Sequence, residues 1–141
     1  MRLVECVPNF SEGRDRAVID AIAQAIAGVT GVKLLDVDPG ADTNRTVYTF
    51  VGPPEAVCDA AVAAARKAAE LIDMSRHAGA HPRMGALDVC PLVPVADMTM
   101  EECAELSRAL GRRIADALQI PVYFYEYAAA SPERRSLADI R

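Results

Sequence analysis

The order of strand-like and helix-like segments is the feature that most constrains how this chain can fold. Runs rich in apolar, β-branched or aromatic residues, which are typical of strands, occupy residues 2–7, 32–38, 45–52 and 87–95. Apolar residues at helical spacing lie between the first two runs and again between the last two. This β-α-β-β-α-β order predicts an α+β fold, the ferredoxin-like split βαβ plait. We expect a mixed, mostly antiparallel sheet with the helices on one face.

Further segments extend this plan toward the C-terminus. Thr99 and Glu102 have the spacing of a capping box and predict a third helix. The aromatic run VYFYEY at 122–127 predicts a fifth strand, and Ser131 starts the pattern of a last helix. Two prolines within 87–95 remove hydrogen-bond donors, which predicts an edge strand or an interrupted one. The plait is therefore extended by an extra helix and strand.

Composition and charge exclude several classes of protein. The length suits a single domain, residues 1–141, and the formal net charge of −5 disfavours general binding to nucleic acid or to an anionic membrane. No apolar run is long enough to cross a membrane, and the N-terminal segment is strand-like rather than a signal peptide. The four cysteines lack C-x-x-C spacing, so we expect structural thiols in a reducing compartment, the cytoplasm.

Three polar loops are predicted to meet at one edge of the sheet. A βαβ crossover makes its two strands parallel, so the loop at 8–14 and the hairpin at 38–45 share an edge, and the loop at 77–86 emerges there too. Polar loops on a rigid sheet commonly form functional sites. The polar residues that these loops carry are Asn9, Ser11, Arg14, Asp38, Asp42, Asn44, Arg45, Arg76, His77, His81 and Arg83.

Both histidines of the chain, His77 and His81, lie in the last of these loops, HAGAHPRMGALD. His81 is a candidate general acid–base, because an imidazole has a pKa of about 6.5, and Asp38 is best placed to orient it. The alternative is a loop histidine without a role and a turn aspartate. Asp88 and Cys90 could add ligands to a metal site, but the spacing fits no zinc pattern, so we expect no metal.

Arg45, Arg76 and Arg83 would bring guanidinium groups to the same edge of an acidic protein. Guanidinium groups recognise carboxylates through paired hydrogen bonds, which makes these arginines candidate substrate-binding residues. Solvated surface charges are the alternative. Asn9 and Ser11 either hydrogen-bond a ligand or only shape the first loop.

Four long motifs resemble the N-terminal subdomain of glutamate formiminotransferase: ECVPNFSEGR (5–14), LLDVDPGADTNRTVYTFVG (34–52), LIDMSRHAGAHPRMGALDVCPLVPV (71–95) and PVYFYEY (121–127). The resemblance runs from residue 3 to the end of the chain. It implies transfer of a formimino group between N-formimino-L-glutamate and tetrahydrofolate, the co-substrate, in histidine degradation. It also implies that His81 is the catalytic histidine and that Asp38 is its acidic partner.

The same family has a transferase region of two similar α/β subdomains, with the folate site between them, and forms dimers. The second subdomain is absent from this sequence, and the last predicted helix stops at Arg141 without a closing signal. We therefore expect a half that needs a C-terminal subdomain or a second subunit, and a homodimer. Two alternatives stay open: a non-catalytic module of the same fold that binds folate or an amino acid, and a metal-dependent enzyme that uses the two histidines.

Overall fold

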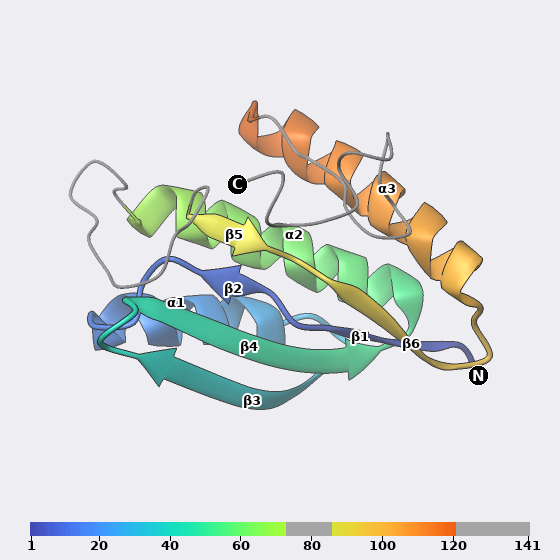
Figure 1. The fold of residues 1–141 in the computed structure, drawn as a ribbon, viewed down its shortest axis with the longest axis horizontal. Coiled ribbons are helices and arrows are strands. Elements are labelled where there is room, and N and C mark those ends of the chain that lie inside the picture. The colour runs from blue at the N-terminus through green and yellow to red at the C-terminus, as the bar shows by residue number, and fades with distance from the viewer. Residues whose placement is uncertain (73–85, 121–141) are drawn as a thin grey trace.

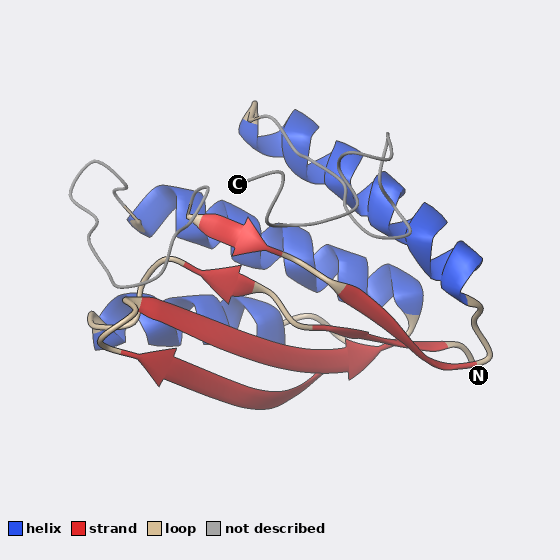
Figure 2. Cartoon of the chain, viewed as in Figure 1, coloured by secondary structure: helices blue, strands red, loops and turns tan. Residues whose placement is uncertain are grey.

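The structure, a computed structural model, describes residues 1–72 and 86–120. Within these ranges, three helices and six strands follow one another along the chain, which confirms an α+β protein. Figure 1 shows how they are arranged, and Figure 2 distinguishes helices from strands. The elements are β1 (Leu3–Cys6), β2 (Asn9–Phe10), α1 (Arg16–Ala27), β3 (Lys33–Gly40), β4 (Arg45–Gly52), α2 (Pro54–Leu71), β5 (Leu87–Val89), β6 (Leu92–Ala96) and α3 (Met100–Leu118).

The described strands form one sheet. Two of its rows each consist of two short strands that follow each other along the chain, β1 with β2 and β5 with β6. β1 and β2 both pair with β4, and β6 and β5 continue the sheet beyond them by pairing with β1 and β2. β3 pairs with the other side of β4. Every pairing between the described strands is antiparallel, so the prediction of a mixed sheet is wrong for this part of the chain. β1 and β3 do run parallel, as the α1 crossover requires, but β4 lies between them.

The strand breaks coincide with prolines, which cannot donate a backbone hydrogen bond. Pro8 lies between β1 and β2, and Pro91 lies between β5 and β6. The predicted interruption of the segment 87–95 is thus confirmed. The sequence predicts that the first strand ends at Pro8, whereas the chain re-enters the sheet as β2. It can do so because the Pro8 carbonyl still accepts a hydrogen bond, at 3.0 Å, from the Tyr48 backbone nitrogen.

The helices begin at residues suited to their first turns. The Asp15 side chain caps α1 by accepting a hydrogen bond from the Ala17 backbone nitrogen at 3.0 Å, and Pro54 occupies the first turn of α2. At the start of α3, the Thr99 hydroxyl accepts from the Glu102 nitrogen at 3.1 Å, and the Glu102 carboxylate accepts from the Thr99 nitrogen at 3.0 Å. The predicted capping box is therefore confirmed.

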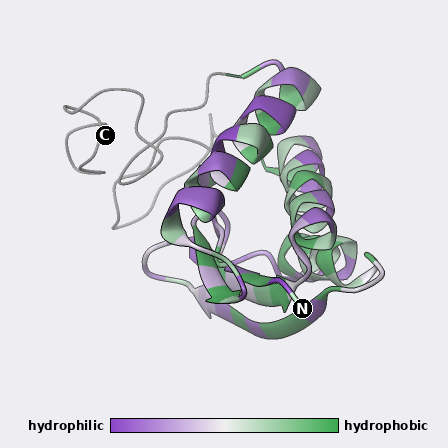
Figure 3. Cartoon of the chain, turned by 90° about the vertical axis from the view of Figure 1, so that its right-hand side faces the viewer, coloured by the Kyte–Doolittle hydropathy of each residue, from purple (hydrophilic) through white to green (hydrophobic). Residues whose placement is uncertain are grey.

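All three described helices lie on one face of the sheet, as predicted (Figure 3). The core fills the space between them and the sheet, and alternate residues of β4, Tyr48 and Phe50 among them, are buried in it. The Phe10 ring contacts the Tyr48 ring edge-on, with 5.4 Å between the ring centroids. The Tyr48 hydroxyl donates to the Ile19 carbonyl at 2.9 Å, which joins β4 to α1.

None of the helices in the described ranges combines the length and the apolar character needed to cross a membrane. The predicted fifth strand at 122–127 and the predicted last helix from residue 131 lie outside the described residues.

Candidate functional site

The candidate site lies on the face of the sheet opposite the helices. Side chains alternate between the two faces of a strand, and Thr46 and Tyr48 of β4 are buried on the helix side. Their neighbours Arg45 and Val47 therefore point to the other face. All three described helices pack on the core side, so none of them covers Arg45 or Val47 (Figure 3).

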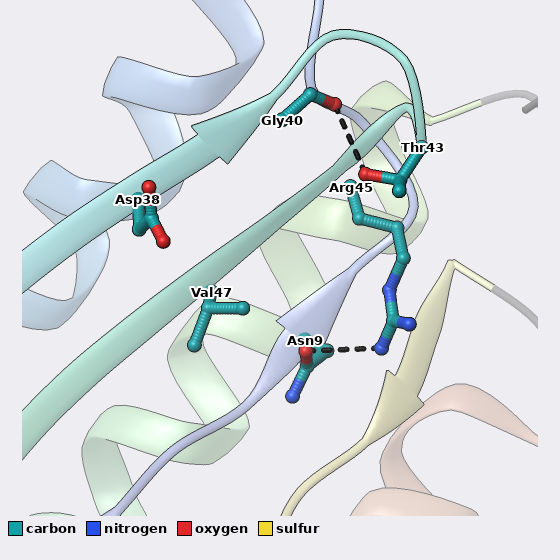
Figure 4. Close-up of a pocket in the computed structure, with 6 residues that line it drawn as sticks. All are labelled: Asn9, Asp38, Gly40, Thr43, Arg45 and Val47. Atoms are coloured by element: carbon teal, nitrogen blue, oxygen red, sulfur yellow. Dashed lines mark hydrogen bonds between the residues drawn. The ribbon is translucent and has the colours of Figure 1, made fainter. Parts of the chain in front are cut away.

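Two predicted site residues, Asn9 and Asp38, lie on either side of Val47 on this face. Asn9 of β2 and Asp38 of β3 both pair with Val47 of β4, so the three residues form one row across three strands. Figure 4 shows the row in front of the sheet, with helices behind it. The register of the sheet therefore brings together residues that are 29 positions apart in the sequence.

A pocket of about 170 Å³ opens over this row. Its wall includes a carboxylate from Asp38, a carboxamide from Asn9 and a guanidinium from Arg45, and the turn between β3 and β4 closes one end. Such a lining can hydrogen-bond a small polar ligand that carries a carboxylate or an amide. The lining residues are Asn9, Asp38, Gly40, Thr43, Arg45 and Val47.

The Arg45 side chain is held between two partners from two other strands. Its Nη2 donates to Asn9 Oδ1 at 2.9 Å and lies 3.3 Å from Asp88 Oδ2. The side chain of Arg45 is 12% exposed and that of Asp88 is 0% exposed. The Asn9 amide is itself fixed, because its Nδ2 donates to the Val7 carbonyl at 3.1 Å. These contacts preorganise the guanidinium at the pocket wall.

Asp88 is a residue of the candidate site that the sequence did not identify as one. The sequence indicates Asp88 only as an optional metal ligand, whereas the structure pairs it with Arg45. The available signal was a lone acidic residue inside the otherwise apolar strand segment LDV of β5, since a buried carboxylate requires a partner. The sequence did not indicate which arginine that partner would be.

The first loop and the β3–β4 hairpin meet, as the topology predicted. The Gly13 nitrogen donates to Asn44 Oδ1 at 2.9 Å, and Arg14 Nε donates to the Ala41 carbonyl at 2.8 Å. A Cβ atom on Gly13 would lie 2.6 Å from the Arg45 nitrogen and would also collide with the Gly40 carbonyl oxygen. Only glycine permits this close approach of the two backbones.

The predicted loop that carries the histidines is followed by a residue that contacts Ser11. The Ser11 nitrogen donates to the carbonyl of Ala86, the first described residue after that loop, at 2.7 Å. His77, His81, Arg76 and Arg83 themselves lie outside the described residues. The Ser11 side chain is fully buried, which favours the interpretation that it shapes the loop.

Three of the cysteines, Cys6, Cys58 and Cys103, do not have the character of catalytic nucleophiles. Burial raises the pKa of Cys6, and hydrogen bonding to Cys90 adds to this rise. Burial also raises the pKa of Cys58 to about 11 and raises the pKa of Cys103. These thiols are protonated at neutral pH, because burial disfavours the thiolate. In residues 1–72 and 86–120, no three His, Cys, Asp or Glu side chains are grouped to hold a metal ion.

Comparisons with known proteins identify the family. Residues 3–141 match the family described as the formiminotransferase domain, N-terminal subdomain. The chain is 59% identical over 140 residues to formimidoyltransferase-cyclodeaminase of Mus musculus, an alignment that covers 99% of this chain and 26% of the mouse protein. It is 54% identical over 141 residues to glutamate formimidoyltransferase of Thermoplasma acidophilum, covering 100% of this chain and 46% of that protein.

A third relative, glutamate formimidoyltransferase of Streptococcus pyogenes, is 47% identical over 140 residues, covering 99% of this chain and 47% of the relative. The chain thus spans between about a quarter and about half of the length of these relatives. The match to the family covers almost the whole chain, including the segments that form the pocket. The chain therefore belongs to the family of the formiminotransferase domain, N-terminal subdomain.

Proposed function

We propose that this chain supplies one half of a glutamate formimidoyltransferase site. The complete enzyme would transfer a formimino group between N-formimino-L-glutamate and tetrahydrofolate, its co-substrate, in histidine degradation. The observation that carries the proposal is the pocket lined by Asn9, Asp38 and Arg45 in a chain of this family. The names of the relatives from Thermoplasma acidophilum and Streptococcus pyogenes support the reaction class.

In this proposal, Asp38 and His81 handle the proton of the reaction. A folate nitrogen attacks the formimino carbon and loses a proton to His81, which then returns the proton to the departing glutamate nitrogen. Asp38 orients the imidazole and stabilises its protonated form. The position of Asp38 at the pocket wall supports this role. Holding both substrates in reacting geometry supplies much of the remaining acceleration.

In this proposal Arg45, Arg76 and Arg83 bind the carboxylates of the two substrates. Asn9 contributes to substrate binding at the pocket wall, and the buried Ser11, also predicted to bind substrate, shapes the first loop. Arg45 is the arginine of this set whose surroundings are described, and it is fixed at the pocket wall by Asn9 and Asp88. A guanidinium that is already fixed in the unbound protein loses less conformational freedom on binding a carboxylate than a mobile guanidinium does.

We further propose that the sheet is a ferredoxin-like split βαβ plait. Its order supports this: β3, β4, β1 and β6 are neighbours in that sequence, each antiparallel to the next. In a split βαβ unit the two parallel strands are separated by a third strand, and β4 has that position between β1 and β3.

The other half of the site would come from a C-terminal subdomain or a second subunit, in a cytoplasmic homodimer. Two observations support a missing half. The relatives are longer than this chain, and the face that carries the pocket exposes the apolar residues Val93 and Val95 of β6, which are 45% and 54% exposed. Apolar surface of this kind commonly marks an interface.

The test is a turnover assay of this chain joined to the second subdomain of a relative. His81→Ala should lower turnover by ~10²–10⁴-fold and change tetrahydrofolate affinity little, since a proton-transfer group acts mainly on the transition state. His77→Ala is the matched control from the same loop and should have a mild effect. Equal damage from both substitutions would point instead to a two-histidine metal site. Folate binding without any turnover in the joined protein would identify a binding module.

A further inference from the structure

Two thiols that the proposed transfer reaction does not use are in direct contact. Cys6 Sγ and Cys90 Sγ lie 3.6 Å apart, although the two residues are 84 positions apart in the sequence. Cys6 ends β1 and is fully buried, whereas Cys90 directly follows β5 and is partly exposed. Cys90 is therefore the member of the pair that keeps some contact with solvent, whereas Cys6 has none.

Cys6 is paired with Phe50 and Leu92 in the sheet, but both cysteines lie next to a break in their row of the sheet. Cys6 precedes the break at Val7 and Pro8, and Cys90 precedes Pro91 in the neighbouring row of the sheet. Neither proline donates a backbone hydrogen bond. The two breaks are joined by a hydrogen bond from the Val7 nitrogen to the Pro91 carbonyl at 3.1 Å. A disulfide needs the sulfurs to close from 3.6 Å to about 2.05 Å, a movement of about 1.5 Å.

We propose that Cys6 and Cys90 form a peroxide-sensitive modification site, in which the folded protein converts the two thiols into a disulfide. This inference goes beyond the proposed transfer reaction and stands without it. It differs from the expectation that all four cysteines are only structural, a role that it leaves to Cys58 and Cys103.

The chemistry balances with a hydroperoxide as the oxidant. The Cys90 thiolate attacks one peroxide oxygen, the O–O bond breaks, and water or an alcohol leaves, so that Cys90 becomes a sulfenic acid. Cys6 sulfur then attacks the Cys90 sulfur, the S–S bond forms, and the S–O bond breaks. The departing hydroxide takes the Cys6 proton and leaves as water. The two thiols lose two electrons in total and the peroxide gains them.

The order of these steps follows from exposure. Burial raises the pKa of Cys6, which keeps it a thiol and out of reach of the peroxide. Cys90 is the accessible member of the pair and reacts first. Cys6 is then already in contact with the sulfenic sulfur, so the second step is intramolecular and is favoured over further oxidation of Cys90.

The bond would form next to both partners of Arg45. Asp88 lies two residues before Cys90, and Asn9 lies three residues after Cys6. A shift that closes the sulfurs would move the backbone that positions these two side chains. The expected consequence, weaker binding of a carboxylate ligand by the oxidised protein, rests on the proposed function, whereas formation of the disulfide does not.

The experiment treats the reduced, folded protein with hydrogen peroxide, blocks the remaining thiols and maps the disulfides by mass spectrometry. Trypsin together with a glutamate-specific protease places the four cysteines on separate peptides. The expected result is a fall from four free thiols to two and a linked pair of peptides that carry Cys6 and Cys90. Dithiothreitol should restore all the thiols.

Cys103→Ser is the matched control, because Cys103 is a buried thiol that contacts the Leu92 carbonyl rather than another sulfur. This variant should still form the Cys6–Cys90 bond, and Cys90→Ser should lose it. The proposal fails if Cys90 is oxidised to the sulfinic acid instead, if it pairs with Cys58, or if the bond forms as fast in denaturant as in the native protein. The mapping needs no enzyme activity, so its failure is distinct from failure of the proposed function.

Discussion

Arg45 and Asp88 form a buried ion pair that links β4 to β5 at the wall of the pocket. Their charged groups lie 3.3 Å apart, between Arg45 Nη2 and Asp88 Oδ2, and the Asp88 side chain is completely buried. Asn9 accepts a hydrogen bond from the same Nη2. The contact joins the first described element after the histidine-bearing loop to the strand that lines the pocket. The pair therefore couples the stability of this edge of the sheet to the geometry of the site.

Asp88→Ala should lower the free energy of unfolding by about 3 kcal/mol, because removing one partner of a buried pair leaves the other charge uncompensated. Urea denaturation followed by circular dichroism measures this change. Asp59→Ala is the matched control: Asp59 pairs with Arg113 at 2.9 Å, but their side chains are 57% and 49% exposed. Loss of that surface pair should cost about 1 kcal/mol or less. Equal losses in the two variants would contradict the buried character of the Arg45–Asp88 pair.

Gly13→Ala should lower the free energy of unfolding by about 2–3 kcal/mol, since the new methyl group would overlap the backbone of Arg45 and Gly40. The loop from 8 to 14 and the β3–β4 hairpin would then move apart. Gly28→Ala is the control, because Gly28 has a φ of −74° and its nearest neighbouring atom, the Gln24 carbonyl oxygen, would lie 3.2 Å from the new Cβ. Thermal unfolding of both variants gives the comparison. A Gly13 variant as stable as the wild type would show that the loop can be rearranged at little cost.

The Glu102 carboxylate should make α3 depend on pH. Hydrogen bonds from the Thr99 backbone and side chain lower the pKa of Glu102, and Arg2 adds to this lowering. A depressed folded-state pKa means that the stabilisation is fully present above the ordinary glutamate pKa and is lost as the pH falls through the lowered value. The unfolding free energy of the wild type should therefore fall toward that of Glu102→Gln on acidification. A difference between the two proteins that stays constant across the acidic range would contradict the capping role.

Local patterns in the sequence predicted most of the described helices and strands. The features that these patterns missed depend on pairing between strands that are far apart in the sequence. The capping box at Thr99 depends on residues three positions apart, so the sequence alone displays it. The re-entry of the chain as β2 depends on the Tyr48 nitrogen, which belongs to a strand far along the sequence. Hydrophobic periodicity does not carry that information.

The same limit applied to the site. Topology correctly predicted that the first loop and the β3–β4 hairpin meet, because the order of connections determines which strand ends share an edge. It also placed Asn9 and Asp38 on a common edge. That both residues pair with Val47 depends on the register of the strands, which the order of connections does not determine. Asp88 was overlooked because a carboxylate on a buried strand becomes interpretable only when its cation is known. The roles of His81, Arg76 and Arg83 remain predictions, since these residues lie outside the described part of the chain.

Asp38→Asn tests the proposed acidic partner of His81 most directly. In a protein that contains both halves of the site, this substitution should lower turnover by about ten- to a hundred-fold, less than His81→Ala, because in the proposed mechanism Asp38 orients and stabilises the imidazole without carrying the proton itself. Asparagine keeps the shape and can still accept a hydrogen bond, so the loss measures mainly the missing negative charge. The pH dependence of turnover should also change on the acidic limb of the profile, because a general base must lose its proton before it can accept one from the substrate.

Asp36→Asn is the matched control for this prediction. Asp36 lies on the same strand as Asp38, is exposed like it, and pairs with Thr49 rather than with Val47, outside the pocket lining. The control should leave turnover and the pH profile unchanged. If Asp36→Asn lowers turnover as much as Asp38→Asn does, the effect comes from the general negative charge of β3, and Asp38 has no specific role. If Asp38→Asn lowers tetrahydrofolate affinity while turnover at saturation stays near the wild-type value, Asp38 binds substrate in the ground state, and the acid–base assignment is wrong.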